Sequence, residues 1–276
     1  ETNNRWSFVA FYNHYGLWAN WDDDGIDGGI ILSGAKKMSE AYVYTGKTIY
    51  ALYCLLLLYK VALLYPDLDL NVWMRLPGRP YRNTDGFSLQ GKATGRICEA
   101  ILARNLCMAA DAVMPVLRTH KEEAESFFSE FASVDAEQIE ETIVDGLLRQ
   151  VFIGVQNGSI GGNEGMYQSA LAIAAVCMGE CEESKKWIKW LFQDGEVIAK
   201  NDPIRVRTER KTGGNLLGIL YDKVNGDGFG NEISPTYNRI WLVEFSRIAD
   251  ILSKYPGIKG TKYDLNTLPK MKKTRD

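Results

Sequence analysis

Apolar residues recur every three or four positions along much of this chain, which is the spacing of one face of an α-helix. Residues 96–113 show the pattern most clearly, with Arg96, Glu99 and Arg104 between the apolar positions. Those apolar positions are Cys98, Leu102, Leu106, Ala109 and Val113. The sequence therefore predicts an amphipathic helix whose three charged residues lie off its apolar face.

Two further stretches have the same periodicity. The first follows Asp135, which forms a capping-box pattern with Gln138. Its apolar positions are Ile139, Ile143, Leu147 and Val151. The second, near the C-terminal end, has Trp241, Phe245, Ile248 and Leu252. Because we find no set of segments alternating between apolar and polar residues, we expect an all-α fold built of helical hairpins.

Polar connections rich in glycine, asparagine and aspartate separate these segments. They are "WDDDGIDGG" at 21–29, "RLPGRPYRNTDGFS" at 75–88, "VQNGSIGGNEG" at 155–165 and "YDKVNGDGFGNEISPTYN" at 221–238. In a protein of helical hairpins, connections gathered at one end are where a functional site is built.

Composition and charge narrow the function classes. The chain has 276 residues, 46% of them hydrophobic, which suffices for one sizeable domain or two small ones. A net charge of −3 argues against a nucleic-acid-binding protein, which usually has a clustered basic face.

Metal and cofactor chemistry has little support in the sequence. The five cysteines lie in or beside apolar helical stretches without CxxC spacing, so we interpret them mostly as small buried residues. The only histidines are His14 and His120, and the acidic clusters lack the spacing of an EF-hand. We therefore expect no cofactor and no metal.

The most apolar run, at 49–65, is interrupted by Lys60 and followed by Pro66. Its uninterrupted part is shorter than the roughly 20 residues that a membrane span needs, so we expect a buried core helix and no membrane association. The first residues show no basic and apolar segments of a secretory signal.

Five segments, taken in order, resemble the helical domain of heparinase II/III-like polysaccharide lyases. They are "SFVAFYNHY", "SEAYVYTGKTIYALYCLLLLYKVALLYPDLD", "GNEGMYQSALAIAAVCMGE", "DGFGNEISPTYNRIWLVEFSRIADIL" and "YDLNTLPKMKK". The resemblance implies an incomplete α/α toroid across residues 1–276, a following C-terminal β-sandwich domain and a periplasmic or secreted location. It also implies an acidic polysaccharide as substrate, cleaved by β-elimination next to a uronic acid.

Such a reaction needs a hydrogen-bond donor to the uronate carboxylate, a base for the C5 proton and an acid for the leaving oxygen. The resemblance places the family's Asn-His pair on Asn163 and Glu164, so the histidine is replaced. Asn163 suits the neutralising role because its amide donates two N–H groups without adding charge. The alternative for Asn163 is a helix cap. The small residues after Ala170 predict a helix that packs tightly among its neighbours.

Glu164 is the main departure from the family pattern, because a carboxylate would repel a bound uronate. It would have to be protonated, face elsewhere, bind a sugar hydroxyl or pair with an arginine. The alternative is an acidic residue in the first helical turn, favoured by the helix dipole.

By the same resemblance, Tyr237 is the candidate proton-transfer residue, and Arg239 lies close enough in sequence to assist it. The alternative is a tyrosine that packs beside Pro235 at a helix start. Further candidate substrate-binding residues are Tyr12, His14, Trp18, Tyr167, Gln168, Arg205 and Arg207. Aromatic rings stack on sugars and arginines bind carboxylates, although core packing and a solvated loop would explain the same residue types.

Two other functions fit the same sequence. A carbohydrate-binding or scaffold domain would have kept the toroid and lost the chemistry, as the replacement at Glu164 suggests. A glycoside hydrolase on an α/α barrel would need two carboxylates across a cleft, for which Glu164 and Glu232 are the candidates.

Overall fold

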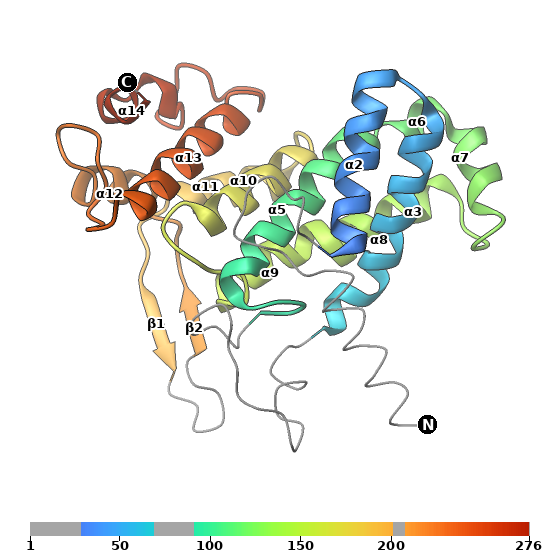
Figure 1. Ribbon diagram of the computed structural model, residues 1–276, viewed down its shortest axis with the longest axis horizontal. Helices are drawn as coiled ribbons and strands as arrows, with labels where there is room; N and C mark the ends of the chain where they lie inside the picture. The colour runs from blue at the N-terminus through green and yellow to red at the C-terminus, as the bar shows by residue number, and fades with distance from the viewer. Residues whose placement is uncertain (1–28, 69–90, 201–207, 276) are drawn as a thin grey trace.

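The computed structural model describes residues 29–68, 91–200 and 208–275. Helices dominate this part of the chain, which confirms the all-α class (Figure 1). The α-helices are α2 (Ile30–Thr45), α3 (Thr48–Leu64), α5 (Arg96–Val113), α6 (Val116–Thr119), α7 (Lys121–Phe128), α8 (Ala136–Ile143), α9 (Arg149–Asn157), α10 (Met166–Cys177), α11 (Glu182–Phe192), α12 (Leu216–Asp222), α13 (Pro235–Leu252) and α14 (Pro269–Arg275). Shorter elements are the helices η2 (Tyr65–Asp67), η3 (Val144–Leu148) and η4 (Leu265–Thr267) and the strands β1 (Val197–Lys200) and β2 (Thr208–Lys211).

Helix α10 lies at the centre of the packing and contacts α5, α9, α11 and α13. Every residue from Met166 to Ala175 is buried, as the run of small residues predicts. Small side chains allow neighbouring helices to approach closely on all sides. The start of α10 is therefore held firmly by the core.

Helix α5 differs from its prediction. Its apolar stripe is buried, but Glu99 and Arg104 are buried as well, so the prediction that these charges lie off the packed face was wrong. Glu99 Oε1 accepts a hydrogen bond from the Tyr65 hydroxyl at 2.5 Å. Its Oε2 accepts three more, at 2.8 to 3.0 Å, from the backbone N–H groups of residues 92–94. Contacts to η2 and to the loop before α5 thus replace water around this carboxylate.

Helix α3 contains the run for which the sequence predicts a core helix. Eight of its residues are buried, and it packs against α2, α5 and α8. By length and composition alone, Thr48–Asp67 and Ile97–Thr119 are apolar enough to cross a membrane, with 50% and 72% of their most apolar stretches buried inside the protein. Core helices of soluble proteins have the same properties, so these two helices are weak evidence for a membrane protein.

The predicted capping box at the start of α8 is confirmed. Asp135 Oδ1 accepts the Gln138 N–H at 2.8 Å, and the Gln138 side chain accepts the Asp135 N–H at 3.0 Å. The helix then widens into the π-turn η3 before continuing as α9. A Cβ at Gly146 would lie 2.1 Å from the carbonyl oxygen of Ala62, so only glycine permits the close approach of η3 to α3.

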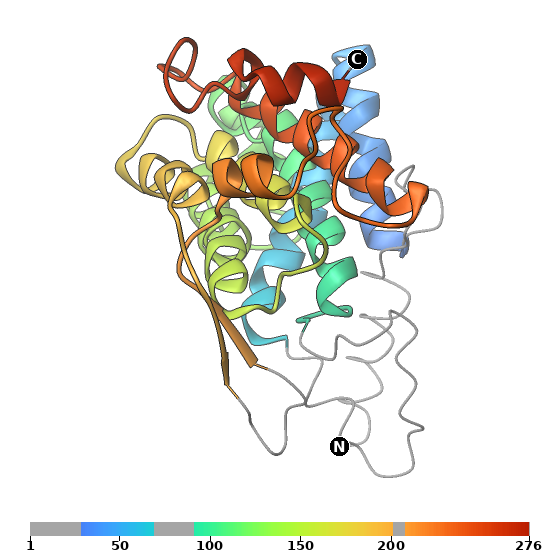
Figure 2. The ribbon, with the colours of Figure 1, turned by 90° about the vertical axis from the view of Figure 1, so that its left-hand side faces the viewer.

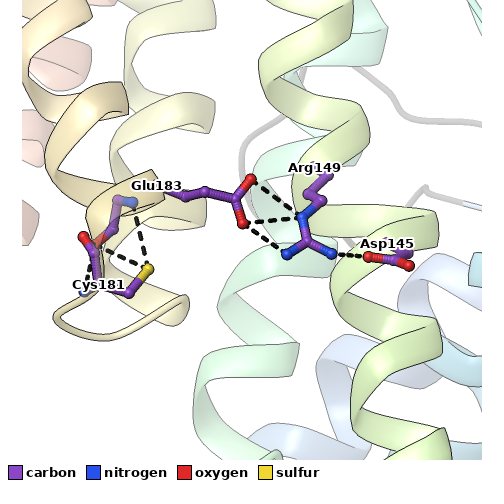
Figure 3. Close-up of polar contacts among 5 residues, drawn as sticks. Asp145, Arg149, Cys181 and Glu183 are labelled. Atoms are coloured by element: carbon purple, nitrogen blue, oxygen red, sulfur yellow. Dashed lines mark hydrogen bonds and ion pairs between the residues drawn. The ribbon is translucent and has the colours of Figure 1, made fainter.

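Arg149 joins this helix to α11 (Figure 3). Its guanidinium binds both carboxylate oxygens of Glu183, at 2.6 to 3.1 Å, and also pairs with Asp145. The contact with Arg149 lowers the pKa of Glu183. Beside it, Cys181 caps α11 by accepting the Ser184 N–H on its sulfur at 3.5 Å.

All five cysteines are free. Cys54, Cys98 and Cys107 are buried, while Cys177 and Cys181 are partly exposed. Burial raises the pKa of the Cys54 thiol to about 12, so it stays protonated at neutral pH. The interpretation of the cysteines as mostly small buried residues is thus confirmed for the three on α3 and α5.

Strands β1 and β2 form an antiparallel hairpin, which the helical periodicity did not predict. Figures 1 and 2 show it extending from the helical body. Its base is fixed by Asn215, whose side chain exchanges two hydrogen bonds of 2.7 Å with the backbone of Gly195. A Cβ at Gly195 would lie 2.1 Å from the nitrogen of Gly213, so the two backbone segments at the base of the hairpin are in close contact there.

Helix α13 buries the four apolar residues that the sequence places on one face, from Trp241 to Leu252. It packs against α10 on one side and α14 on another. The connection from α12 to α13 closes with a bridge between Val224 and Gly230. This arrangement brings the start of α13 and the turn before α10 into one region.

Candidate functional site

The turn at 161–165 leads directly into α10. That helix begins at Met166, and its N-cap is Gly165, whose φ of +96° favours glycine. Asn163 and Glu164 lie three and two residues before the helix. Both alternatives drawn from the sequence, a cap at Asn163 and a first-turn acid at Glu164, were therefore wrong.

The side-chain amide of Asn163 is the polar feature of this turn. Its Nδ2 is buried and has no hydrogen-bond partner within the described part of the chain. Burying an amide donor without a partner costs on the order of 1–3 kcal/mol. Because this nitrogen has almost no solvent-accessible surface, a ligand oxygen reaches it only if the turn or its neighbours move, and such a contact would then recover that free energy.

Glu164 forms an ion pair with Lys223, at the end of α12. Lys223 Nζ donates to Glu164 Oε1 at 2.6 Å, and both side chains are partly exposed. The sequence suggested an arginine as a possible partner, and the structure provides a lysine. The lysine compensates the negative charge that would otherwise repel a uronate bound near Asn163.

The turn rests on a buried charged network. A Cβ at Gly165 would lie 2.6 Å from the Cβ of Glu244, so turn and α13 are in direct contact. Glu244 Oε1 accepts hydrogen bonds from Arg104 at 2.5 Å and from Arg247 at 2.8 Å, and its Oε2 accepts one from Ser169 at 2.5 Å. The network joins α5, α10 and α13 below the candidate site.

Sequence reasoning missed Glu244, although a signal for it exists. It lies three residues after Trp241 and four before Ile248, so it occupies the apolar face of α13. A carboxylate on such a face requires a buried partner. Arg104 on α5 provides that partner, although its position off the apolar face of α5 gave no such signal.

Tyr237 lies in the first turn of α13, with 41% of its surface exposed, and Arg239 beside it is also exposed. This exposure favours an accessible hydroxyl over a tyrosine packed at the helix start. Tyr237 precedes Glu244 by two helical turns, roughly 10 Å along the axis. Tyr237 therefore lies about two helical turns along α13 from the point where the turn of Asn163 contacts that helix. No hydrogen bond between described residues joins the side chains of Asn163 and Tyr237.

Between Tyr237 and Glu244, two more buried polar atoms have no hydrogen-bond partner among the residues that the structure describes. They are Asn238 Oδ1 and Trp241 Nε1. The amide nitrogen of Asn238 is used, since it donates to the carbonyl of Glu232 at 2.5 Å. The start of α13 thus resembles the Asn163 turn in having unused hydrogen-bonding capacity.

Tyr167 and Gln168 have structural roles rather than the predicted substrate contacts. Both are buried. The Tyr167 ring faces Lys211 Nζ, 3.4 Å from its centroid. The Gln168 amide accepts from the Gly165 N–H at 2.8 Å and donates to the Gly214 carbonyl at 3.1 Å. Gln168 therefore fixes the turn of Asn163 to the base of the hairpin.

The remaining candidates, Tyr12, His14, Trp18, Arg205 and Arg207, lie outside the described residues. Within the described ranges, no group of three or more histidine, cysteine, aspartate or glutamate residues could hold a metal ion. The chain matches no protein-family model, no curated protein and no solved structure.

Proposed function

We propose that this chain is the helical domain of a polysaccharide lyase that cleaves a uronate-containing polymer by β-elimination. The proposal includes an incomplete α/α toroid, a β domain that completes the site, and a periplasmic or secreted location. The observation that carries it is the unpartnered donor of Asn163, placed beside a glutamate whose charge Lys223 compensates.

In the proposed reaction, the Asn163 amide donates to the substrate carboxylate and so makes the C5 proton more acidic. Tyr237, as the phenolate, accepts that proton and then delivers it to the leaving oxygen. The electron pair of the C5–H bond forms the C4–C5 double bond, and the C4–O bond breaks. Arg239 is the cation nearest to this tyrosine in sequence.

The Glu164–Lys223 pair also bears on the hydrolase alternative. A general acid must donate a proton to the glycosidic oxygen, whereas the Glu164 carboxylate oxygen Oε1 accepts a hydrogen bond from Lys223 at 2.6 Å. The lyase is therefore the better supported of the two catalytic functions.

The test is product formation by the full-length natural protein on alginate, hyaluronan and heparin. We expect one of these polymers to give an unsaturated product that absorbs ultraviolet light. The rate of its formation should fall by about a hundredfold or more in Asn163→Ala and in Tyr237→Phe. Asn157→Ala at the end of α9 and Tyr44→Phe on α2 are exposed matched controls and should retain activity. New reducing ends without absorbance would indicate a hydrolase, and binding without products would indicate a non-catalytic module.

A further inference from the structure

The connection from α12 to α13 is fastened to α14. Lys270 Nζ donates to the carbonyls of Tyr221 at 2.5 Å and Val224 at 2.7 Å. A Cβ at Gly228 would lie 2.5 Å from the carbonyl oxygen of Lys273, so the tip of the connection touches the α14 backbone. The connection and α14 therefore form one surface, at the same end of the molecule in Figure 1.

This surface exposes aromatic rings. Tyr221 is 62% exposed and Phe229 is 60% exposed. The backbone holds Phe229 in place, because its carbonyl accepts the Asn225 N–H at 2.7 Å and Gly230 next to it forms the bridge with Val224. A large apolar ring held outward on a fixed turn offers a flat face for a sugar ring.

Helix α14 contributes basic charge to this surface, while the segment from α12 to α13 has two exposed aspartates, Asp222 and Asp227. Helix α14 has four basic residues and no acidic one, on a chain whose net charge is −3. Arg275 is paired with Asp250. Lys272 and Lys273 are exposed and have no ion-pair partner within the described part of the chain. Their charges favour a polymer that carries carboxylates or sulfates.

The surface is continuous with the candidate site. Lys223 lies between Tyr221 and the connection and is bonded to Glu164, the residue next to Asn163. A polymer bound at Asn163 would therefore pass Lys223 before reaching Phe229 and α14.

We infer that Tyr221, Phe229, Lys272 and Lys273 form an accessory binding surface for an acidic polysaccharide, here called the α14 surface. The rings stack on pyranose faces, and the lysines bind the acidic groups of units beyond the one that reacts. That the same polymer extends to Asn163 rests on the proposed function.

The test measures dissociation constants of the full chain for alginate, hyaluronan and heparin, with dextran as the neutral polymer. We expect Lys272→Ala/Lys273→Ala to weaken binding of an acidic polymer by about fivefold or more, and added salt to weaken wild-type binding. Phe229→Ala should weaken it by about threefold or more, and Phe229→Tyr should restore it. Heparin binding without alginate or hyaluronan binding would identify sulfate as the recognised group.

The matched controls lie on the α2–α3 hairpin, at the opposite end of the molecule in Figure 1. Lys37→Ala/Lys47→Ala removes two exposed charges, and Tyr44→Ala removes an exposed ring. Equal losses in controls and test variants would overturn the inference, as would no binding of any acidic polymer by the wild type. If the wild type forms product while the α14 variants bind the polymer as tightly as the wild type does, the inference about the α14 surface is wrong and the lyase proposal stands. If the α14 variants lose binding and the controls do not, but no product forms, only the lyase proposal is wrong.

Discussion

Glu99 and Glu244 are both buried on long helices, yet their surroundings differ. Glu99 is bound by neutral donors, the Tyr65 hydroxyl and three backbone N–H groups. Glu244 is bound by two guanidinium groups and the Ser169 hydroxyl. One carboxylate therefore holds a loop against a helix start, and the other balances cationic charge below the candidate site.

The difference predicts how each region responds to loss of its carboxylate. Neutral donors around Glu99 tolerate another acceptor of similar shape, and Lys92, the buried cation near this carboxylate, keeps its hydrogen bonds to the carbonyls of Tyr65 and Pro66. Arg104 is buried and donates to Glu244, so removing that carboxylate takes an ion-pair partner from a cation in the core. The Glu244 network should therefore be the more sensitive of the two.

The largest effect is expected for Glu244→Leu. Loss of the buried ion pair with Arg104 should lower the free energy of unfolding by about 3–5 kcal/mol, measured by urea denaturation. The turn of Asn163 contacts Glu244 through Gly165, so in the proposed lyase substrate turnover should fall as well.

The double variant Arg104→Met/Glu244→Leu separates charge from packing. Replacing the whole pair by apolar residues should recover much of the loss, because no buried charge remains. If the double variant were as unstable as the sum of the single variants, the ion pair would not be the cause, and the proposed contrast with Glu99 would fail.

A smaller, pH-dependent effect is expected for Glu99→Gln. Burial raises the folded-state pKa of Glu99 above its ordinary value of 4.5. The folded protein then binds this proton more tightly than the unfolded chain does, so the carboxyl contributes full stability below pH 4.5 and loses it as pH rises through the folded pKa. Glutamine does not titrate, so the wild-type advantage over Glu99→Gln should shrink across that window, by at most about 1.4 kcal/mol per pH unit.

Urea denaturation of both proteins from pH 4 to pH 8 checks this sign. Tyr65→Phe is the matched perturbation, because the Tyr65 hydrogen bond lowers the Glu99 pKa and its loss should extend the window to higher pH. A wild-type advantage that grew with pH would show instead that the four donors outweigh desolvation.

Local signals in the sequence predicted much of the fold. The capping box at Asp135 and the buried face from Trp241 to Leu252 depend on residues within one or two turns of each other, and the structure confirms both. The π-turn at Gly146 could not be predicted, because it depends on the approach of α3 from more than 80 positions earlier in the chain.

The candidate site was less predictable, since its partners are distant in sequence. Helical periodicity placed Glu99 and Arg104 off the packed face of α5, because it treats one face as solvated, whereas α5 has neighbours on several sides. The pair of Glu164 with Lys223 spans 59 positions and has no local signal. The position of Asn163 before a helix was predicted, and the helix start itself was placed two residues too early.

Glu164 is a third carboxylate for comparison, and its ion pair with Lys223 lies at the surface. Breaking this pair should have the smallest effect on the free energy of unfolding. Because both side chains are partly exposed, Lys223→Ala should change the free energy of unfolding by less than about 1 kcal/mol. In the proposed lyase it should nevertheless raise KM for an acidic polymer severalfold, because Glu164 would then repel the uronate near Asn163. Adding Glu164→Ala should restore KM, and this recovery separates repulsion by Glu164 from the loss of a direct lysine contact. If KM stayed high in the double variant, Lys223 itself would bind the polymer, and the compensation assigned to it here would be wrong.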